Sequence, residues 1–277
     1  MIVVSGARGM LGTYLDGDGI LKTDLPELDV TDAVAVRKFV AAHRPELFLH
    51  LAALTDVDQC ERQPELAERV NVTATRNVAG ACAEADCAML YVSTAQVFPG
   101  TKPSGYVETD ATGPVNVYGR TKLAGEEVVR ATVAKHYIVR TSWLMGGGAD
   151  TEKKFVGKLL ELMKTGRELR VVDDKRGSPT YARDLAETLR KLTESGRFGT
   201  YHAANRGSCT RFELARALTE LTGADVSVHP VPSTDFPLPA RRPDSEVLLT
   251  TELARAGLPL LRPWREALRG YLHEWGY

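Results

Sequence analysis

The sequence predicts an α/β protein built around a doubly wound parallel sheet, with a smaller C-terminal α/β lobe. Short apolar runs rich in β-branched residues recur through the first 145 residues, stretches of helical periodicity separate them, and a glycine-rich turn directly follows the first run. Parallel strands are buried on both faces and therefore appear as continuous apolar runs. Their alternation with helices is typical of a sheet covered by helices on both sides.

The expected elements follow in order along the chain. Strands are expected at residues 1–5, 20–22, 47–53, 88–92 and 137–140, and helices at about 33–42 (N-capped by the segment ending at Asp32), 55–84 (with a turn or helix start at Pro64) and from about 117. Beyond residue 145 we expect helices at 155–165, 182–194, 211–222 and 263–275, strands at 169–172, 200–203 and 226–230, and a proline-rich loop at 231–243 that could reach over a site.

This order predicts two units without a sharp linker. Residues 1–145, together with about 166–204, are expected to form a dinucleotide-binding domain. Residues of about 146–165 and 205–277 are expected to form a substrate-binding lobe.

Composition excludes several classes of protein. The 277 residues carry a net charge of −1, which gives no electrostatic reason to expect nucleic acid or a membrane surface as partner. No apolar run approaches the roughly 20 residues that span a bilayer, and the N-terminus does not resemble a secretion signal. The four cysteines form no CxxC pair and the six histidines show no ligand spacing. We therefore expect a cytoplasmic protein with reduced thiols and no bound metal.

A glycine-rich turn follows the first strand. Gly6, Gly9 and Gly12 are spaced as G-x-x-G-x-x-G, with Met10 and Leu11 between the last two. Glycines allow a tight turn and a close approach of a pyrophosphate to the backbone, and a helix starting there would offer free N–H groups. The spacing favours a dinucleotide site, and the alternative is an ordinary turn between a strand and a helix.

Residues at the next two strand ends fit the same interpretation. Asp24 lies 18 residues after Gly6, where an acid commonly binds the adenosine ribose. Arg8 and Lys22 are near enough in sequence to accommodate a 2′-phosphate, so NADH and NADPH both remain open. The small Ala52 and Ala53 end the third strand, either to admit the cofactor or simply to pack tightly.

Tyr118 and Lys122 are the candidate catalytic pair. Their spacing places them on one face of a helix. A lysine beside a tyrosine is expected to lower the pKa of the phenol, which could then act as a general acid toward a carbonyl oxygen. The alternative is a surface helix with a solvated lysine. Thr94 is delivered by the fourth strand to the carboxyl edge of the sheet, where open α/β sheets bind ligands.

Together these segments resemble the extended short-chain dehydrogenase/reductase family, which has a Rossmann-like fold, and within it the branch of dTDP-4-dehydrorhamnose reductases. The resemblance runs almost end to end and is carried by GARGMLG, LDVTD, LAALTDVDQCE, STAQVFPG, VNVYGRTKLAGE, RTSWLMGGG, RGSPTYARDLA, PARRP and PWREAL. It implies a catalytic set of Thr94, Tyr118 and Lys122, in which Lys122 also holds the nicotinamide ribose.

The resemblance also implies binding residues. Trp143 corresponds to a residue that packs on the sugar nucleotide, although a core or rim aromatic is an equal alternative, and Thr94 and Ala95 fall where the family contacts the substrate. The positions that correspond to cofactor contacts are Gly6, Gly9, Met10, Leu11, Gly12, Asp24, Asp29, Val30, Ala52, Ala53 and Leu54, with Tyr118 and Lys122.

Two positions depart from the family's pattern. Ala95 stands where the family has an acid, so one substrate hydrogen bond is missing, a change of about 0.5–1.5 kcal/mol. Tyr14 stands where members that dimerise around magnesium carry an acid, and a tyrosine is a poor magnesium ligand. We therefore expect a monomer or a metal-independent homodimer.

The resemblance implies NADPH- or NADH-dependent reduction of the 4-keto group of a dTDP-linked 4-keto-6-deoxysugar, with dTDP-4-dehydrorhamnose as the leading substrate and dTDP-L-rhamnose as product. Ala95 and Gln96 leave open a modified deoxysugar of natural-product biosynthesis. A non-catalytic regulatory subunit with the same fold is a third hypothesis.

Overall fold

The structure, a computed structural model, describes the backbone of all 277 residues and the side chains of all except Ala149. Its largest element is a sheet of six parallel strands in the order β10-β5-β4-β3-β1-β2. These strands are β1 (Ile2–Ser5), β2 (Ile20–Thr23), β3 (Leu47–His50), β4 (Ala88–Thr94), β5 (His136–Thr141) and β10 (Gly199–His202). The predicted Rossmann-like, doubly wound sheet is confirmed.

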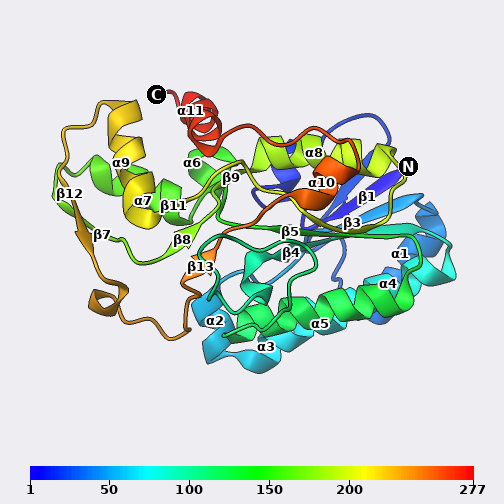
Figure 1. Cartoon of the computed structure of the whole chain (residues 1–277). Coiled ribbons are helices and arrows are strands. Elements are labelled where there is room, and N and C mark those ends of the chain that lie inside the picture. The colour runs from blue at the N-terminus through cyan, green and yellow to red at the C-terminus, as the bar shows by residue number, and fades with distance from the viewer.

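Helices cover both faces of this sheet (Figure 1). Val4 and Leu90 pack on one side, and their neighbours Val3 and Met89 pack on the other. Successive side chains of a strand point to opposite faces, so a strand buried on both sides is apolar at nearly every position. The first side is covered by α8 (Ala182–Glu194) and α10 (Thr251–Arg255), and the second by α1 (Ala33–His43), α4 (Ala74–Glu84) and α5 (Val117–Thr132).

The helical stretch between β3 and β4 is interrupted, as the proline predicts. Asp56 caps α2 (Val57–Arg62) through the N–H of Gln59, and α3 (Pro64–Glu68) then begins at the proline. A π-helical turn, η2 (Arg69–Thr73), joins α3 to α4. Such turns inside α-helices occur frequently at functional sites.

The predicted helix after the glycine-rich turn is not formed, and this expectation was wrong. The chain makes only one 3₁₀ turn, η1 (Gly12–Tyr14). The sequence Asp16-Gly17-Asp18-Gly19 follows almost at once, with both glycines at positive φ. Glycine is a poor helix former, and a single turn cannot offset the cost of helix nucleation.

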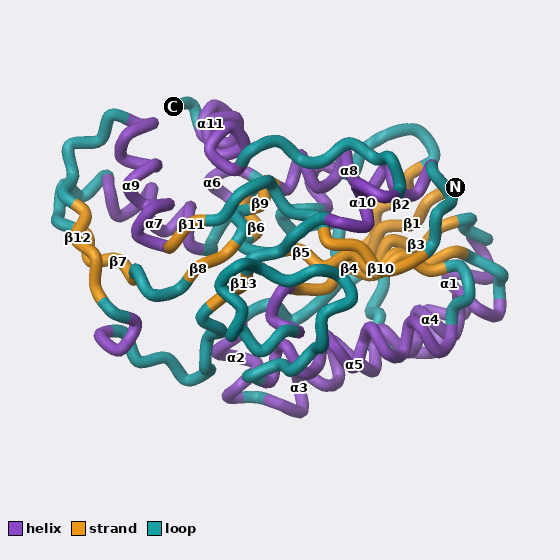
Figure 2. The backbone as a smooth tube through the Cα atoms, in the orientation of Figure 1, coloured by secondary structure: helices purple, strands orange, loops and turns teal.

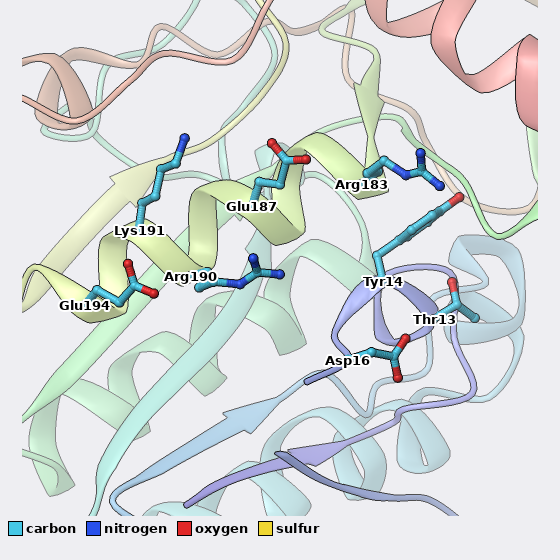
Figure 3. Close-up of a pocket in the computed structure, with 8 residues that line it drawn as sticks. All are labelled: Thr13, Tyr14, Asp16, Arg183, Glu187, Arg190, Lys191 and Glu194. Carbon is cyan, nitrogen blue, oxygen red and sulfur yellow. The ribbon is translucent and has the colours of Figure 1, made fainter. Parts of the chain in front are cut away.

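The one-turn η1 leaves a surface groove beside α8 (Figure 3), with a volume of about 780 Å³. Three acidic and three basic side chains line it, so their formal charges cancel. With Thr13 and Tyr14 these are Asp16, Glu187, Glu194, Arg183, Arg190 and Lys191. None of the predicted catalytic residues lies in this groove.

Two strand ends also differ from prediction. β3 ends at His50 rather than Ala53, because the following residues leave the sheet to contact the glycine-rich turn and η2. β4 continues to Thr94 rather than residue 92, because β5 runs beside it up to the pair Thr94 and Thr141.

The lobe is assembled around a separate apolar core (Figure 1). Its helices are α6 (Gly148–Thr151), α7 (Phe155–Met163), α9 (Arg211–Thr222) and α11 (Trp264–Glu274). Short strands join them in three small sheets: β6 (Leu144–Met145) with β9 (Thr180–Tyr181), β7 (Leu169–Val172) with β12 (Val228–Val231), and β8 (Arg176–Gly177) between β11 (Cys209–Thr210) and β13 (Ser245–Glu246).

The proposed division into two units remains a prediction. Of the residues 166–204 expected with the first unit, α8 and β10 pack in the large sheet, whereas β7 pairs with β12 in the lobe. The strand expected at 226–230 forms as β12, and a short α10 that was not expected returns to the large sheet.

Candidate active site

The predicted site residues follow the carboxyl ends of five adjacent strands of the sheet. The glycine-rich turn follows β1, Asp24 follows β2, Ala52 follows β3, Thr94 ends β4 and Trp143 follows β5. Because these strands are parallel, their carboxyl ends lie at one edge of the sheet. The topology therefore gathers residues that lie far apart in the sequence.

The start of α5 places Tyr118 beside Thr94. Asn116 caps the helix by accepting from the N–H of Gly119 at 2.8 Å, and its amide donates to Gln96 Oε1 at 2.9 Å. Gly119 packs directly on the turn after Thr94, since a Cβ there would lie 2.2 Å from the carbonyl oxygen of Gln96. This close approach brings the Tyr118 phenol within hydrogen-bonding reach of Thr94.

The pKa of Tyr118 is raised above its ordinary value of 10.0, mainly by burial. The hydrogen bond with Thr94 lowers it, and Cys60 and Glu246 raise it further. The expectation that Lys122 lowers this pKa was wrong, because the lysine ammonium lies over another ring. The phenol keeps its proton at neutral pH, as a general acid requires.

Lys122 is buried against β4. Gly125 allows this approach, since a Cβ there would lie 2.3 Å from the Tyr91 hydroxyl oxygen. The Nζ atom of Lys122 lies 4.0 Å from the centroid of the Tyr91 ring, and burial lowers its pKa to about 7, opposed by the charge of Glu126. The alternative of a solvated surface lysine is excluded.

Glu126 cannot neutralise Lys122 fully, because other groups occupy its carboxylate. Arg140 binds both oxygens, at 2.9 and 2.8 Å, and Ser93 and Arg130 each donate at 2.6 Å. Although burial raises the pKa of Glu126, Arg140 holds it below its ordinary value. This network anchors α5 to β4 and β5.

The glycine-rich turn fits a diphosphate. Gly6 adopts φ +70°, and a Cβ there would lie 2.6 Å from the backbone nitrogen of Ala52. A Cβ at Gly12 would lie 2.4 Å from the carbonyl oxygen of Ala7, so both positions require glycine. Within the described residues, the N–H groups of Met10 and Leu11 donate to no other group of the chain. They can therefore bind an anion.

Asp24 is attached to this turn through the N–H of Arg8, at 3.0 Å. The Arg8 guanidinium donates to the carbonyl of Leu25 and to Glu27, each at 2.7 Å, and Lys22 forms an ion pair with Asp16. Both cations that could accommodate a 2′-phosphate are therefore engaged with acids. The geometry leaves the choice between NADH and NADPH open.

The segment Ala52–Leu54 is held by a side chain that the sequence did not single out. Asn71 in η2 accepts from the N–H of Leu54 at 2.8 Å and donates to its carbonyl oxygen at 3.1 Å. It also donates to Thr121 of α5 at 3.0 Å. Asn71 therefore fixes the strand end relative to the helix of Tyr118 and Lys122.

Asp29 and Val30 lie in the loop between β2 and α1. Asp29 accepts from the N–H and hydroxyl of Thr31, which lower the pKa of its carboxyl. Asn77 donates to the carbonyl oxygen of Val30 at 3.1 Å. The loop is thereby attached to α4.

Ala95 was expected to contact the substrate, but its side chain points into the protein interior. Its methyl group is fully buried in an apolar cluster with Val97, Phe98 and Tyr106. The 3₁₀ turn η3 (Ala95–Val97) directs the side chain into this cluster, so it has no exposed surface to offer a sugar.

Trp143 adopts φ +41°, an unusual conformation for a bulky residue. Its Nε1–H donates to Glu246 at 3.1 Å, and the guanidinium carbon of Arg211 lies 3.5 Å from the centroid of its ring. Strained residues often lie at binding sites. Trp143 thus connects the sheet edge to the lobe.

The lobe is attached to the start of α2 at two points. Asp58 accepts from both Nη atoms of Arg242, at 3.0 and 2.8 Å, and from the N–H of Ala240 at 3.1 Å. Lys154 donates to Thr55 at 3.2 Å. The segment 231–243 therefore runs from β12 to the start of α2 (Figure 2), and its reach over a site stays a prediction.

The residues that sequence reasoning missed differ in the signals they carry. Asn116 precedes a helical stretch as an N-cap does, so its capping role could have been read from the sequence. Asn71, Arg211 and Glu246 stand in no local motif. Their positions depend on contacts between distant segments.

Two further findings bear on the predictions about metals and thiols. Among the described side chains, no group of three or more His, Cys, Asp or Glu residues is arranged to hold a metal ion. All four cysteines are free and buried, as predicted.

None of the helices in the described chain combines the length and apolar character needed to cross a membrane.

The family model described as RmlD substrate binding domain matches residues 1–276. A dTDP-4-dehydrorhamnose reductase of Mycolicibacterium smegmatis is 42% identical, covering 97% of this chain and 84% of the relative. A crystal structure of a dTDP-4-dehydrorhamnose reductase from Clostridium acetobutylicum superposes with a TM-score of 0.96 at 36% identity, covering 100% of this chain and 99% of that one. The reductase from Bacillus anthracis, in complex with NADP, gives a TM-score of 0.95 at 36% identity over 99% and 98% of the two chains.

Proposed function

Because the chain belongs to the RmlD substrate binding domain family, we propose that it reduces the 4-keto group of dTDP-4-dehydrorhamnose to form dTDP-L-rhamnose, using NADPH or NADH. The observation that carries the proposal is the protonated, partly buried phenol of Tyr118 beside Thr94, at the sheet edge that also holds the glycine-rich turn. The relatives named as dTDP-4-dehydrorhamnose reductases support the substrate.

The residues present fit a nicotinamide dinucleotide. Gly6 and Gly12 let the turn pack tightly against the backbone of Ala52 and Ala7, and the N–H groups of Met10 and Leu11 would donate to a diphosphate bound there. Asp24 would hold the adenosine ribose, and Ala52 to Leu54 would line the cofactor path. When bound, the cofactor supplies the hydride.

The chain's own residues supply the proton and the positioning. Tyr118 would donate its phenolic proton to the oxygen at C4 as that oxygen gains negative charge. Thr94 would hold the same oxygen or the phenol by a hydrogen bond. Lys122 would bind the nicotinamide ribose and so hold the cofactor beside Tyr118.

The sugar nucleotide is proposed as the partner, whereas nucleic acid and membrane are not. The chain is proposed to act in the cytoplasm, as a monomer or a metal-independent homodimer. Tyr14 supports metal independence, because its hydroxyl already donates to Glu274 and accepts from the N–H of Gly147.

The test is loss of NADPH and, separately, NADH absorbance with freshly prepared dTDP-4-dehydrorhamnose, followed by identification of the product by NMR. Turnover to dTDP-L-rhamnose is the expected result. If the protein reduced only a modified deoxysugar, that sugar would replace dTDP-4-dehydrorhamnose as the proposed substrate. Cofactor binding without turnover of either sugar would favour a regulatory subunit, and no cofactor binding would contradict the proposal as a whole.

A further inference from the structure

Two charged side chains of the lobe, those of Glu246 and Arg211, contact the ring of Trp143. Its Nε1–H donates to Glu246, and Arg211 stacks on the ring and lies 4.6 Å from the centroid of Phe155 as well. Gly177 packs against the same indole, since a Cβ there would lie 2.3 Å from its Cε2 atom. The protein itself thus covers much of the ring, and the two charged groups are left to meet a ligand.

Among the side chains that the structure describes, neither charged group forms an ion pair. Glu246 is 7% exposed, and the hydrogen bond its carboxylate accepts comes from a neutral indole. Within the described side chains, Arg211 makes ring contacts but no hydrogen bond or ion pair, although burial lowers its pKa to about 10. A carboxylate has about four acceptor sites and a guanidinium five donors, and a buried charge such as that of Glu246 is normally paired. Both groups therefore have unused hydrogen-bonding capacity.

The cluster is close to the candidate catalytic residues. β13, which carries Glu246, pairs with β8, and the N–H of Ser245 donates to the carbonyl of Gly100, just beyond the turn that follows Thr94. The negative charge of Glu246 raises the pKa values of both Tyr118 and Arg211. The carboxylate therefore lies within electrostatic range of the candidate acid and of the guanidinium.

The two opposite charges favour a polyol over an anion. A phosphate would be attracted by Arg211 and repelled by Glu246, and Glu152 adds a second negative charge that acts on Arg211. Arg242, which repels Arg211, is already neutralised by Asp58. Neighbouring hydroxyl groups suit both side chains, because one can donate to the carboxylate while the other accepts from the guanidinium.

We propose that Glu246 and Arg211 bind the neighbouring C2 and C3 hydroxyl groups of the sugar, so that the enzyme selects 4-keto sugars that carry both. This inference rests on the proposed function and specifies its substrate class. It assigns the hydroxyl-binding role to a carboxylate and a guanidinium of the lobe. It leaves the diphosphate to other groups.

The experiment compares kcat/KM for dTDP-4-dehydrorhamnose and for its 2,3-dideoxy counterpart, which lacks both hydroxyl groups. The wild-type protein is expected to prefer the sugar with both hydroxyls by about 10- to 100-fold, the factor for one hydrogen bond to a charged group. Glu246→Gln is expected to lower kcat/KM for that sugar far more than for the 2,3-dideoxy sugar, so the preference falls. Glu220→Gln is the matched control, because Glu220 forms an exposed ion pair with Arg265 in the same lobe. This variant should keep the wild-type sugar preference.

Arg211 is tested through the affinity for dTDP alone, measured by calorimetry with cofactor present. Arg211→Gln should reduce the sugar preference and leave dTDP affinity unchanged. Arg265→Gln is the matched control, because the Arg265 guanidinium also lies over a tryptophan ring, and it should change neither the sugar preference nor the dTDP affinity. If Arg211→Gln weakened dTDP binding as much as turnover, Arg211 would bind the diphosphate and the proposal would be overturned. Should Arg211→Gln fail to fold, Glu246→Gln decides.

The outcomes of these experiments distinguish failure of the hydroxyl selectivity from failure of the proposed function. Wild-type protein that reduced both sugars equally well would overturn the hydroxyl selectivity and keep the reductase. Equal losses on both sugars in Glu246→Gln would show a structural role and also overturn it. Wild-type protein that turned over neither sugar would contradict the proposed function, and the inference would fall with it.

Discussion

The sheet edge and the lobe build their parts of the site in different ways. At the edge, each side chain is placed by a short segment that packs on a neighbouring strand: Gly119 on the turn after β4, and Gly125 on Tyr91. The second cluster instead joins Trp143, which follows β5, to Arg211 and Glu246 of the lobe, and these three distant segments meet through ring contacts and one hydrogen bond. Proton transfer therefore depends on local geometry, whereas sugar selection depends on tertiary assembly.

The largest expected effect is at the edge. Tyr118→Phe removes the proton donor, and kcat is expected to fall by about 10²- to 10⁴-fold, the usual contribution of a general acid. Cofactor affinity, measured by calorimetry, should remain unchanged, because the ring still fills its position. Wild-type turnover in this variant would show that the edge does not carry the proton transfer.

Lys122 makes the stability of the edge depend on pH. Its folded pKa of about 7 is below its ordinary value of 10.5, so between these values the unfolded chain binds more protons than the folded one. The free energy of unfolding of wild-type protein should therefore rise with pH relative to Lys122→Met across pH 7 to 10.5, by at most about 1.4 kcal/mol per pH unit. Parallel curves from denaturant titrations of the two proteins would contradict the burial of a titrating ammonium.

Gly119→Ala tests whether close packing places Tyr118. The added methyl would meet the Gln96 carbonyl, so we expect a loss of about 1–3 kcal/mol of stability and a fall in kcat. Gly80→Ala is the matched control in α4, where a Cβ meets nothing within 4 Å, and it should stabilise by about 0.5–1 kcal/mol. If both variants gained stability in thermal unfolding, helix propensity would outweigh the contact.

The smallest expected effect is at the attachment of the lobe. Asp58→Asn removes the ion pair with Arg242, whose partners are 20% and 23% exposed, so the loss of stability should stay below about 1 kcal/mol. We expect KM for the sugar nucleotide to rise with kcat unchanged, because the attachment orients the lobe and not Tyr118. Asp86→Asn, in an exposed pair with Lys135, is the control. If kcat fell by the same factor as KM rose, the attachment of the lobe would also affect proton transfer at the sheet edge, and the two regions would not act separately.

The sequence by itself determined the features that depend on a few neighbouring residues. Apolar runs marked the strands of the sheet, Asp32 and Pro64 marked helix starts, and parallel strands guaranteed that Thr94 and the glycine-rich turn would share an edge. Each of these follows from a few neighbouring residues, since periodicity and capping act over one or two turns.

Only the tertiary structure decided the remaining features. Burial raised the pKa of Tyr118 and lowered that of Lys122, because desolvation depends on every element packed around a group and not on its neighbours in sequence. The missing helix after the glycine-rich turn left a groove beside α8. Arg211 and Glu246, 35 residues apart, meet at the ring of Trp143 because β13 pairs with β8, a contact that no local pattern encodes.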